Sequence, residues 1–290
     1  MEAGKLSEVT GFDGHWTAGG WRDSLTLSTL IGWEVPRVTV GTSILSIWQL
    51  PPIALAEQLL TVHDALGGRF TAGLGLSHFH MVESRFGRKF ERPIRYMREY
   101  LTILRAALDD RLVDFQGEIL SASTDIRVPA QSRPQLLFAA LGPQAVSVAS
   151  RLADGLLTFM VPLPSLEKMT IPRAESAAAS VGRLRPRVCV ELPICLTSDH
   201  ERARESAAET FANYGSGYYP SYRAALDRGG IEGPADVAVI GDERFILGQL
   251  RDYRDSGIDE IAYVPFSSDS DRERTHEFLG NLAREGVLRV

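Results

Sequence analysis

The stretch RFTAGLGLSHFHMVE, residues 69–83, holds a short apolar run with two spaced glycines, followed at once by two histidines and a glutamate. Short apolar runs that alternate with longer segments of helical spacing are typical of a parallel sheet with crossover helices. Residues 69–76 therefore predict one strand of such a sheet. If such strands close into a barrel, the residues just after each strand are the candidates for the active site. The two histidines therefore lie where catalytic residues are expected.

The same alternation continues along the chain. Six further apolar runs predict strands, at residues 13–18, 37–44, 134–140, 155–160, 187–196 and 258–266. Segments with apolar residues at three- and four-residue steps lie between them and predict helices, of which the longest covers 91–110. Seven parallel strands indicate either an open doubly wound sheet or a (β/α)8 barrel, and an eighth strand would decide between the two.

Length and charge narrow the classes of function. The chain has 290 residues, of which 31 are basic and 37 acidic, and its net charge is −6. This balance lacks the electrostatic footprint of a nucleic-acid or membrane-surface binder. No run approaches the roughly 18 apolar residues of a membrane span, and the first residues lack the pattern of a signal peptide. We expect one cytoplasmic domain over 1–290 that binds a small molecule, with insertions around 161–172 and 214–236 that are candidates for lids.

The two cysteines, Cys189 and Cys195, fall in the one apolar run RVCVELPICL. Six residues along a strand separate them by roughly 20 Å, which is too far for a disulfide. The same distance argues against a metal pair. We therefore expect two buried free thiols.

The spaced glycines of the first stretch do not form a nucleotide fingerprint. Gly73, Gly75 and Ser77 lack the third glycine of the GxGxxG pattern, and no helix starts directly after the second glycine. Glycines inside a strand more often mark the close approach of another backbone or of a flat group. This favours a ring that lies against the strand over a phosphate held in a loop.

The histidines that follow allow several interpretations. His78 and His80 could bind a metal with Glu83, but such a pair needs a further ligand that the sequence does not reveal, so we predict no metal. Loop histidines without a chemical role remain possible. Contact with substrate or cofactor also remains open, since a histidine at a strand end can hold or move a proton near neutral pH.

Several segments, taken in order, resemble one known family. They are GTSIL at 41–45, GGRFTAGLGLSH at 67–78, ERPIRYMREYLTILRAAL at 91–108, AALGPQAVSVASRLADGLLTFM at 139–160 and IDEIAYVPF at 258–266. The set resembles the luciferase-like superfamily, and more narrowly its members that use the deazaflavin coenzyme F420. The resemblance implies an α/β fold of the (β/α)8 TIM-barrel type whose first strand is absent from this chain, as a gene start placed too late would produce.

The resemblance also implies an activity and a cofactor site. It implies a homodimer that moves a hydride between coenzyme F420 and a small organic substrate. In the family the strand that matches residues 37–44 ends in a non-proline cis peptide behind the flavin ring, here between Ser43 and Ile44. The turn at 139–144 opens a helix whose N-terminus can bind the coenzyme phosphate. The implied cofactor-binding residues are Ser43, Ile44, Leu45, Ser46, Gly75, Leu76, Ser77, Ala139, Ala140, Leu141, Gly142, Pro143, Gln144 and Thr158.

One position departs from the family pattern. Several members place an acidic residue and a catalytic histidine after the strand that matches 13–18, whereas this chain has Ala18, Gly19 and Gly20 there. A second family acid corresponds to His78. We therefore predict His78 as the catalytic residue, unless the chemistry needs no proton from the protein. Trp21 and Asp23, just beyond the gap, could shape a substrate pocket.

Two other functions stay open at this point. One is an FMN-dependent luciferase-like monooxygenase, which would take reduced flavin from a partner and activate oxygen. The other is a non-catalytic deazaflavin-binding relative that has lost its acid and histidine. The GTSI and AALGP segments favour F420 as cofactor, with FMN as the alternative.

Overall fold

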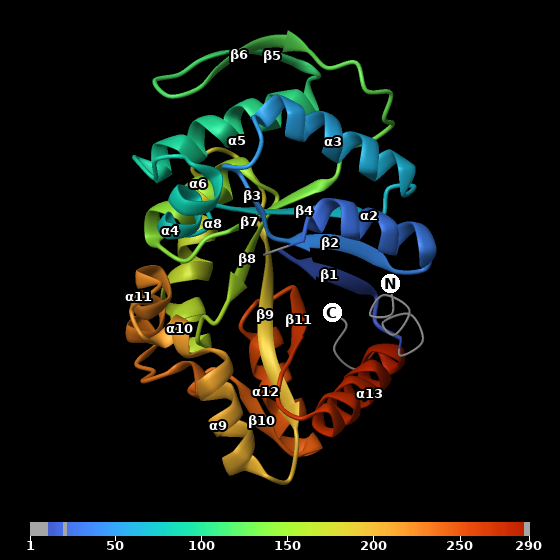
Figure 1. Ribbon diagram of the computed structural model, residues 1–290, viewed down its shortest axis with the longest axis vertical. Coiled ribbons are helices and arrows are strands. Elements are labelled where there is room, and N and C mark those ends of the chain that lie inside the picture. The colour runs from blue at the N-terminus through green and yellow to red at the C-terminus, as the bar shows by residue number, and fades with distance from the viewer. Residues whose placement is uncertain (1–10, 20–21, 287–290) are drawn as a thin grey trace.

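The computed structural model describes residues 11–19 and 22–286 of the chain. Its centre is a curled sheet of parallel strands in the order β1-β2-β4-β7-β8-β9 (Figure 1). Strand β11 pairs in parallel with residues 189–194 of β9. All seven predicted strands are present. They are β1 Gly14–Ala18, β2 Thr39–Ser43, β4 Phe70–Gly75, β7 Gln135–Ala139, β8 Gly155–Phe159, β9 Arg187–Leu196 and β11 Glu260–Pro265. There are also two short strands: β3 Leu45–Ser46 pairs with β4, and β10 Val239–Gly241 pairs with β9.

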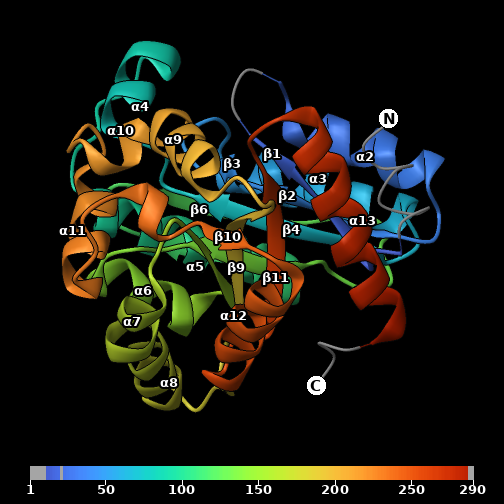
Figure 2. The same ribbon diagram turned by 90° about the horizontal axis from the view of Figure 1, so that it is seen from below.

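Helices cover the outside of the curled sheet (Figures 1 and 2). They are α2 Ser24–Glu34, α3 Pro52–Ala65, α4 Phe79–Phe86, α5 Pro93–Asp109, α6 Pro143–Leu152, α7 Leu163–Ser165, α8 Ile171–Ala179, α9 His200–Thr210, α10 Ala212–Gly215, α11 Pro220–Gly229, α12 Glu243–Asp255 and α13 Asp269–Glu285. Within the described residues, no helix is both long enough and apolar enough to cross a membrane.

The two segments predicted as insertions contain helices. Residues 161–172 hold α7, a π-helical turn and the start of α8, and residues 214–236 hold α11 with parts of its neighbours. The prolines in these segments stand in first helical turns, where a missing N–H costs nothing. Leu166 and Ile171 are buried in the core, which fixes the first segment as helix.

The hairpin of β5 Leu112–Gln116 and β6 Ser121–Asp125 was not expected from the sequence. It packs on the outer side of α5 (Figure 1). The Glu99 carboxylate of α5 accepts three hydrogen bonds from the backbone amides of residues 118–120 at its turn. These bonds hold the turn of the hairpin, while Val113, Phe115 and Ala122 pack against the core from alternate positions of its strands.

The edges β1 and β11 do not pair as strands in the part of the chain that the structure describes. A side-chain bridge joins them instead: Trp16 Nε1 donates to Glu260 Oε1 over 2.6 Å, and Arg187 of β9 forms an ion pair with the same carboxylate. The arrangement agrees with a barrel that lacks one strand.

Alternate residues of the strands face the two sides of the sheet. On β9, Val188 and Val190 pack toward the outer helices, whereas Cys189 contacts Leu137 and Leu157 inside the curl. Cys189 and Cys195 are both buried and free, as predicted. The inner face of the sheet therefore has a separate apolar core of its own. The candidate site lies on this face at the carboxyl ends of the strands.

A partly buried network of charged side chains surrounds Asp154. Asp154, just before β8, accepts hydrogen bonds from Arg105 over 2.6 Å, from Arg133 over 2.6 Å and from Arg183 over 3.2 Å. It also accepts from the Leu136 amide over 2.9 Å. Burial alone would raise the pKa of Asp154, but the bonds from Arg133, the Leu136 amide and Arg105 outweigh it and lower the pKa to about 2.

We expect this network to make stability depend on acid pH. Because the pKa of Asp154 falls from its ordinary 3.8 to about 2 on folding, its contribution is complete at neutral pH and is lost as pH falls from about 4 toward 2. Asp154→Asn should lower the free energy of unfolding by about 2 kcal/mol at pH 7. Urea denaturation measures it, with the exposed Asp114→Asn as control. A loss of the same size at pH 7 and pH 2.5 would contradict this.

Candidate active site

The carboxyl ends of five strands lie at one level of the inner face. Ala18 is paired with Ser43, Gly75 with Ala139, and Phe159 closes β8. In parallel barrels this edge is where active sites form, because the loops after the strands converge there. We call this region the barrel mouth.

The chain makes a sharp bend at the end of β2. The Ser43–Ile44 peptide bond is cis, as the resemblance implies. The Gly19 amide donates to the Ser43 carbonyl over 3.0 Å, and a Cβ on Gly19 would lie 2.5 Å from the Ile44 carbonyl oxygen. In this chain the backbone therefore leaves no room for a side chain at Gly19. Gly20 and Trp21 lie outside the described residues.

The two glycines of β4 are required by the same bend. A Cβ on Gly73 would lie 1.9 Å from the Thr42 carbonyl oxygen. A Cβ on Gly75 would lie 2.9 Å from Ile44 Cδ1 and 3.3 Å from the Ala139 Cβ. The prediction that these glycines mark a close approach of backbone is confirmed for Gly73. Contact of a flat ring with Gly75 stays a prediction.

His78 begins the segment that leaves the mouth. Ser77, with φ +58°, turns the chain out of β4, and His78 is the residue before α4. The His78 ring stacks on Tyr219 with centroids 3.9 Å apart. Burial, and then the neighbouring His80, lower the pKa of His78 to about 4. His78 is therefore a neutral imidazole at pH 7, able to give or accept a hydrogen bond but poorly suited to hold a proton.

A group of aromatic side chains lies over the mouth. Phe159 meets Tyr214 edge to face with centroids 5.0 Å apart, and Tyr214 meets Tyr222 at 4.8 Å. In both ribbon views α10 and α11 lie beside α4 (Figures 1 and 2). We call the group the aromatic cover; its members are His78, His80, Phe159, Tyr214, Tyr218, Tyr219 and Tyr222. The candidate lid around 214–236 thus contributes its tyrosines to this region.

Glu191 faces the mouth and was missed in the sequence. It stands opposite Phe159 and Ala262, on the same face of β9 as Cys189. Burial raises the pKa of Glu191 to about 7, although the nearby Ser43 hydroxyl opposes the rise. The available signal was a single carboxylate inside an apolar strand, which is rare for a buried position.

The turn after β7 presents an open helix end. Gly142 precedes α6 with no side-chain cap, and a Cβ built on it would meet nothing within 4 Å. Arg228 of α11 donates from Nη2 to the Leu141 carbonyl over 2.7 Å, while its buried Nε has no partner among the described residues. A guanidinium beside a helix N-terminus places two positive groups together, an arrangement that suits an anion. Arg228 was not recognised from the sequence.

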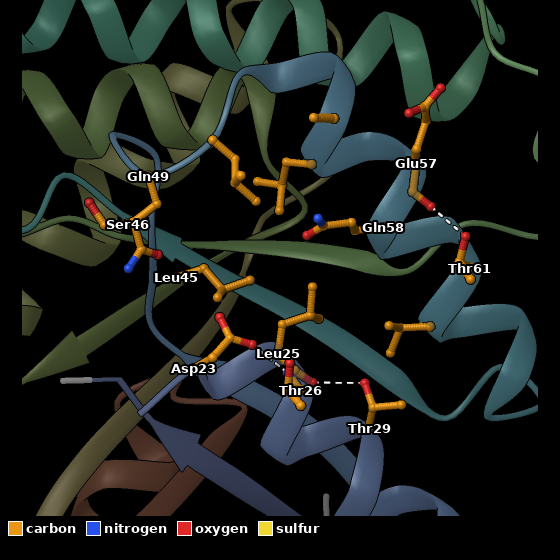
Figure 3. Close-up of a pocket in the computed structure, with 14 residues that line it drawn as sticks. Asp23, Leu25, Thr26, Thr29, Leu45, Ser46, Gln49, Glu57, Gln58 and Thr61 are labelled. Carbon is orange, nitrogen blue, oxygen red and sulfur yellow. Dashed lines mark hydrogen bonds between the residues drawn. The ribbon is translucent and has the colours of Figure 1, made fainter. Parts of the chain in front are cut away.

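Three of the predicted cofactor residues face elsewhere. Thr158 is 2% exposed and alternates with the inward-facing Leu157, so its side chain lies on the helix-covered side. Leu45 and Ser46 line a groove of about 720 Å³ between α2 and α3 (Figure 3). Asp23, which was considered for a substrate pocket, caps α2 through the Thr26 amide and lines the same groove.

Except for Ala140, which is buried in the outer core, the other predicted residues come together at the mouth. Ser43, Ile44 and Gly75 form one wall, with Leu76 and Ser77 directly after it. On the neighbouring strand, the segment from Ala139 to Gln144 runs into α6. The cofactor contacts of these residues stay predictions.

Comparison with known proteins places the chain in a family. A 5,10-methylenetetrahydromethanopterin reductase of Archaeoglobus fulgidus is 24% identical over 99% of this chain and 86% of its own length. A putative coenzyme F420-dependent oxidoreductase of Mycobacterium tuberculosis is 28% identical over 68% of this chain and 62% of its own length. The structure of an F420-dependent secondary alcohol dehydrogenase, in complex with an F420-acetone adduct, matches with a TM-score of 0.83 at 17% identity.

That structural match covers 98% of this chain and 93% of the other, and it confirms the luciferase-like TIM-barrel class of fold. The family model described as luciferase-like monooxygenase matches residues 1–260. The resemblance inferred from the sequence is thereby confirmed. Because the match covers most of the 290 residues, this chain belongs to the luciferase-like monooxygenase family of enzymes.

Proposed function

We propose that the chain is an oxidoreductase that moves a hydride between coenzyme F420 and a small organic substrate. The observation that carries the proposal is the open N-terminus of α6 with Arg228 beside it, in a chain of this family. The relatives named above include F420-dependent oxidoreductases, which supports the choice of cofactor. The deazaflavin would act as hydride acceptor or donor, and the protein would place it and its substrate.

The described residues fit a flat ring joined to a phosphate. We place the ring against the wall of Ser43, Ile44 and Gly75, where glycine and a turned backbone leave a flat surface. We place the phosphate at the amides after Gly142, within the reach of Arg228. The unpartnered Nε of Arg228 is a donor that such a phosphate would satisfy.

The monooxygenase alternative uses the same geometry. An FMN phosphate carries the same charge as the coenzyme phosphate, so the α6 N-terminus and Arg228 would suit it as well. The description of the family favours this second candidate. A non-catalytic binder is the third, and the sequence Ala18, Gly19 and Gly20, where the resemblance implies an acid and a histidine, motivates it.

We also propose that the protein is a cytoplasmic homodimer. The exposed apolar side chains of Leu30 and Trp33, 53% and 73% exposed on α2, offer surface suited to contact with a second copy. Light scattering of the purified chain measures its mass, and a monomer at micromolar concentration would contradict the proposed assembly.

Fluorescence titration tests the cofactor directly. We expect the chain to bind F420 with a Kd in the micromolar range or below, and FMN at least about tenfold more weakly, which is a difference of about 1.4 kcal/mol. The same titration with the deazaflavin riboside, which lacks the phosphate, isolates the ring site. If neither F420 nor FMN binds, the proposed function is wrong.

The phosphate contact has a matched variant in the same experiment. Arg228→Met should weaken F420 about tenfold, since a charge-assisted hydrogen bond contributes about 1.5–3 kcal/mol. It should leave the affinity for the riboside unchanged, because the ring does not reach Arg228. Arg251→Met, at an exposed position of α12, serves as control. Equal effects on F420 and the riboside would contradict the placement of the phosphate.

His78→Ala tests the predicted catalytic residue. If the neutral imidazole holds the substrate by a hydrogen bond, kcat/KM should fall about tenfold while the Kd of F420 stays constant. Since the pKa of His78 is about 4, this loss should not vary with pH between 6 and 9. The exposed His200→Ala is the control. Unchanged turnover would rule out a catalytic role for His78.

A further inference from the structure

The barrel mouth contains one acidic group that the proposed function does not use. We propose that Glu191 is the acid–base catalyst of the site, and that the substrate is an alcohol or the carbonyl compound formed from it. This inference rests on the proposed function, because it assigns the proton that must accompany the hydride.

The position of Glu191 supports this role. Its neighbours in register are Phe159, the last residue of β8, and Ala262 of β11, so it lies at the level where the strands end. Its side chain faces inward, since the adjacent Val190 and Leu192 belong to the outer core. The carboxyl group is thus half-buried at the mouth of the barrel, not on the surface.

Ser43 shows that the carboxyl group lies beside the proposed ring. Ser43 is the last residue of β2 and precedes Ile44, which lies against Gly75. Because the Ser43 hydroxyl is close enough to lower the pKa of Glu191, the carboxyl group lies next to the wall on which we place the deazaflavin. A substrate that meets the ring there can reach Glu191 with its oxygen atom.

No cation neutralises this carboxyl group among the residues that the structure describes. The titratable groups that face it are the phenols of Tyr214 on α10 and Tyr222 on α11, and the Cys189 thiol on its own strand. The Ser43 hydroxyl of β2 also lies near it and lowers its pKa. All these neighbours are neutral at pH 7, because burial raises the pKa of each phenol and of the thiol.

The environment leaves Glu191 able to give and to accept a proton. Burial holds its pKa at about 7, so both forms are populated at neutral pH, which is the condition for efficient acid–base catalysis. His78, whose pKa is about 4, carries almost no proton at the same pH. This chain has Ala18, Gly19 and Gly20 where the resemblance implies an acid and a histidine, and Glu191 supplies a proton site from a different strand.

The reaction balances with this residue in place. In the oxidative direction the substrate loses a hydride from its carbinol carbon and a proton from its hydroxyl oxygen. The C–H and O–H bonds break and the C=O bond forms. The hydride, with its electron pair, goes to oxidised deazaflavin, and the proton goes to the Glu191 carboxylate. In the reverse direction protonated Glu191 donates to the carbonyl oxygen as the hydride returns to carbon.

The walls around Glu191 suit a small alcohol that is partly apolar. Phe159, Tyr214 and Tyr222 meet edge to face over the mouth. The phenols of Tyr214 and Tyr222 lie near enough to the carboxyl group for its charge to raise their pKa. An apolar carbon skeleton with one hydroxyl group matches this mixture.

The test compares Glu191→Gln with the wild-type chain, both loaded with F420. The readouts are the Kd of F420, and the rate at which propan-2-ol, cyclohexanol and benzyl alcohol reduce the bound cofactor from pH 5.5 to 9. For the wild type we expect the rate to rise with pH through an inflection near 7, because the carboxylate is the base. For Glu191→Gln we expect a pH-independent rate lower by about 10²–10⁴-fold, with an F420 Kd within about twofold.

Three further variants make the assignment specific. Ser43→Ala removes a hydroxyl group that favours the charged carboxylate, so the inflection should move to higher pH. Glu191→Asp keeps a carboxyl group and should retain an inflection at a reduced rate. Glu209→Gln, at an exposed position on α9, should match the wild type. The Glu191→Asp result also decides the matter if Glu191→Gln does not fold.

The outcomes separate this inference from the proposed function. A wild-type chain that does not bind F420 contradicts the proposed function. A chain that binds F420 but is reduced by none of the three alcohols overturns the substrate class proposed here. Glu191→Gln with the rate and pH profile of the wild type overturns the role of Glu191, even if the cofactor claim holds.

Discussion

The structure of the mouth depends on one close approach of backbone. Where the chain bends between Thr42 and Ile44, its carbonyl groups come so near to the neighbouring strands that Gly19 and Gly73 cannot carry a side chain. Gly75 is restricted in the same way by the Ile44 side chain. The bend thus fixes glycine on both flanking strands, and the flat wall at the strand ends follows from it.

The same bend restricts the segment after β1 in this chain. A side chain at Gly19 would have to displace the Ile44 carbonyl group. The bend also brings the Ser43 hydroxyl close to Glu191, on a strand far away in sequence. One local feature therefore shapes the proposed ring wall and brings Glu191 beside it.

Much of the fold could be predicted from the sequence, because buried parallel strands are continuous apolar runs that can be recognised locally. The strand ends that form the mouth followed from the same runs. The hairpin β5–β6 could not be predicted, because its turn is held by hydrogen bonds to the Glu99 carboxylate of another element. Arg228 was missed for a similar reason, since it reaches Leu141 from 87 residues away. The facing of Leu45 and Ser46 was also beyond sequence, since a bend changes which side of the sheet a residue faces, whereas the outward facing of Thr158 follows from the alternation along β8.

The central claim is that the barrel mouth holds a deazaflavin against the wall of Ser43, Ile44 and Gly75. A crystal structure of the chain with bound F420 tests it most directly. The account predicts the ring on that wall, with the phosphate within hydrogen-bond distance of the amides that begin α6. A ring bound elsewhere, such as in the groove between α2 and α3, would contradict the account.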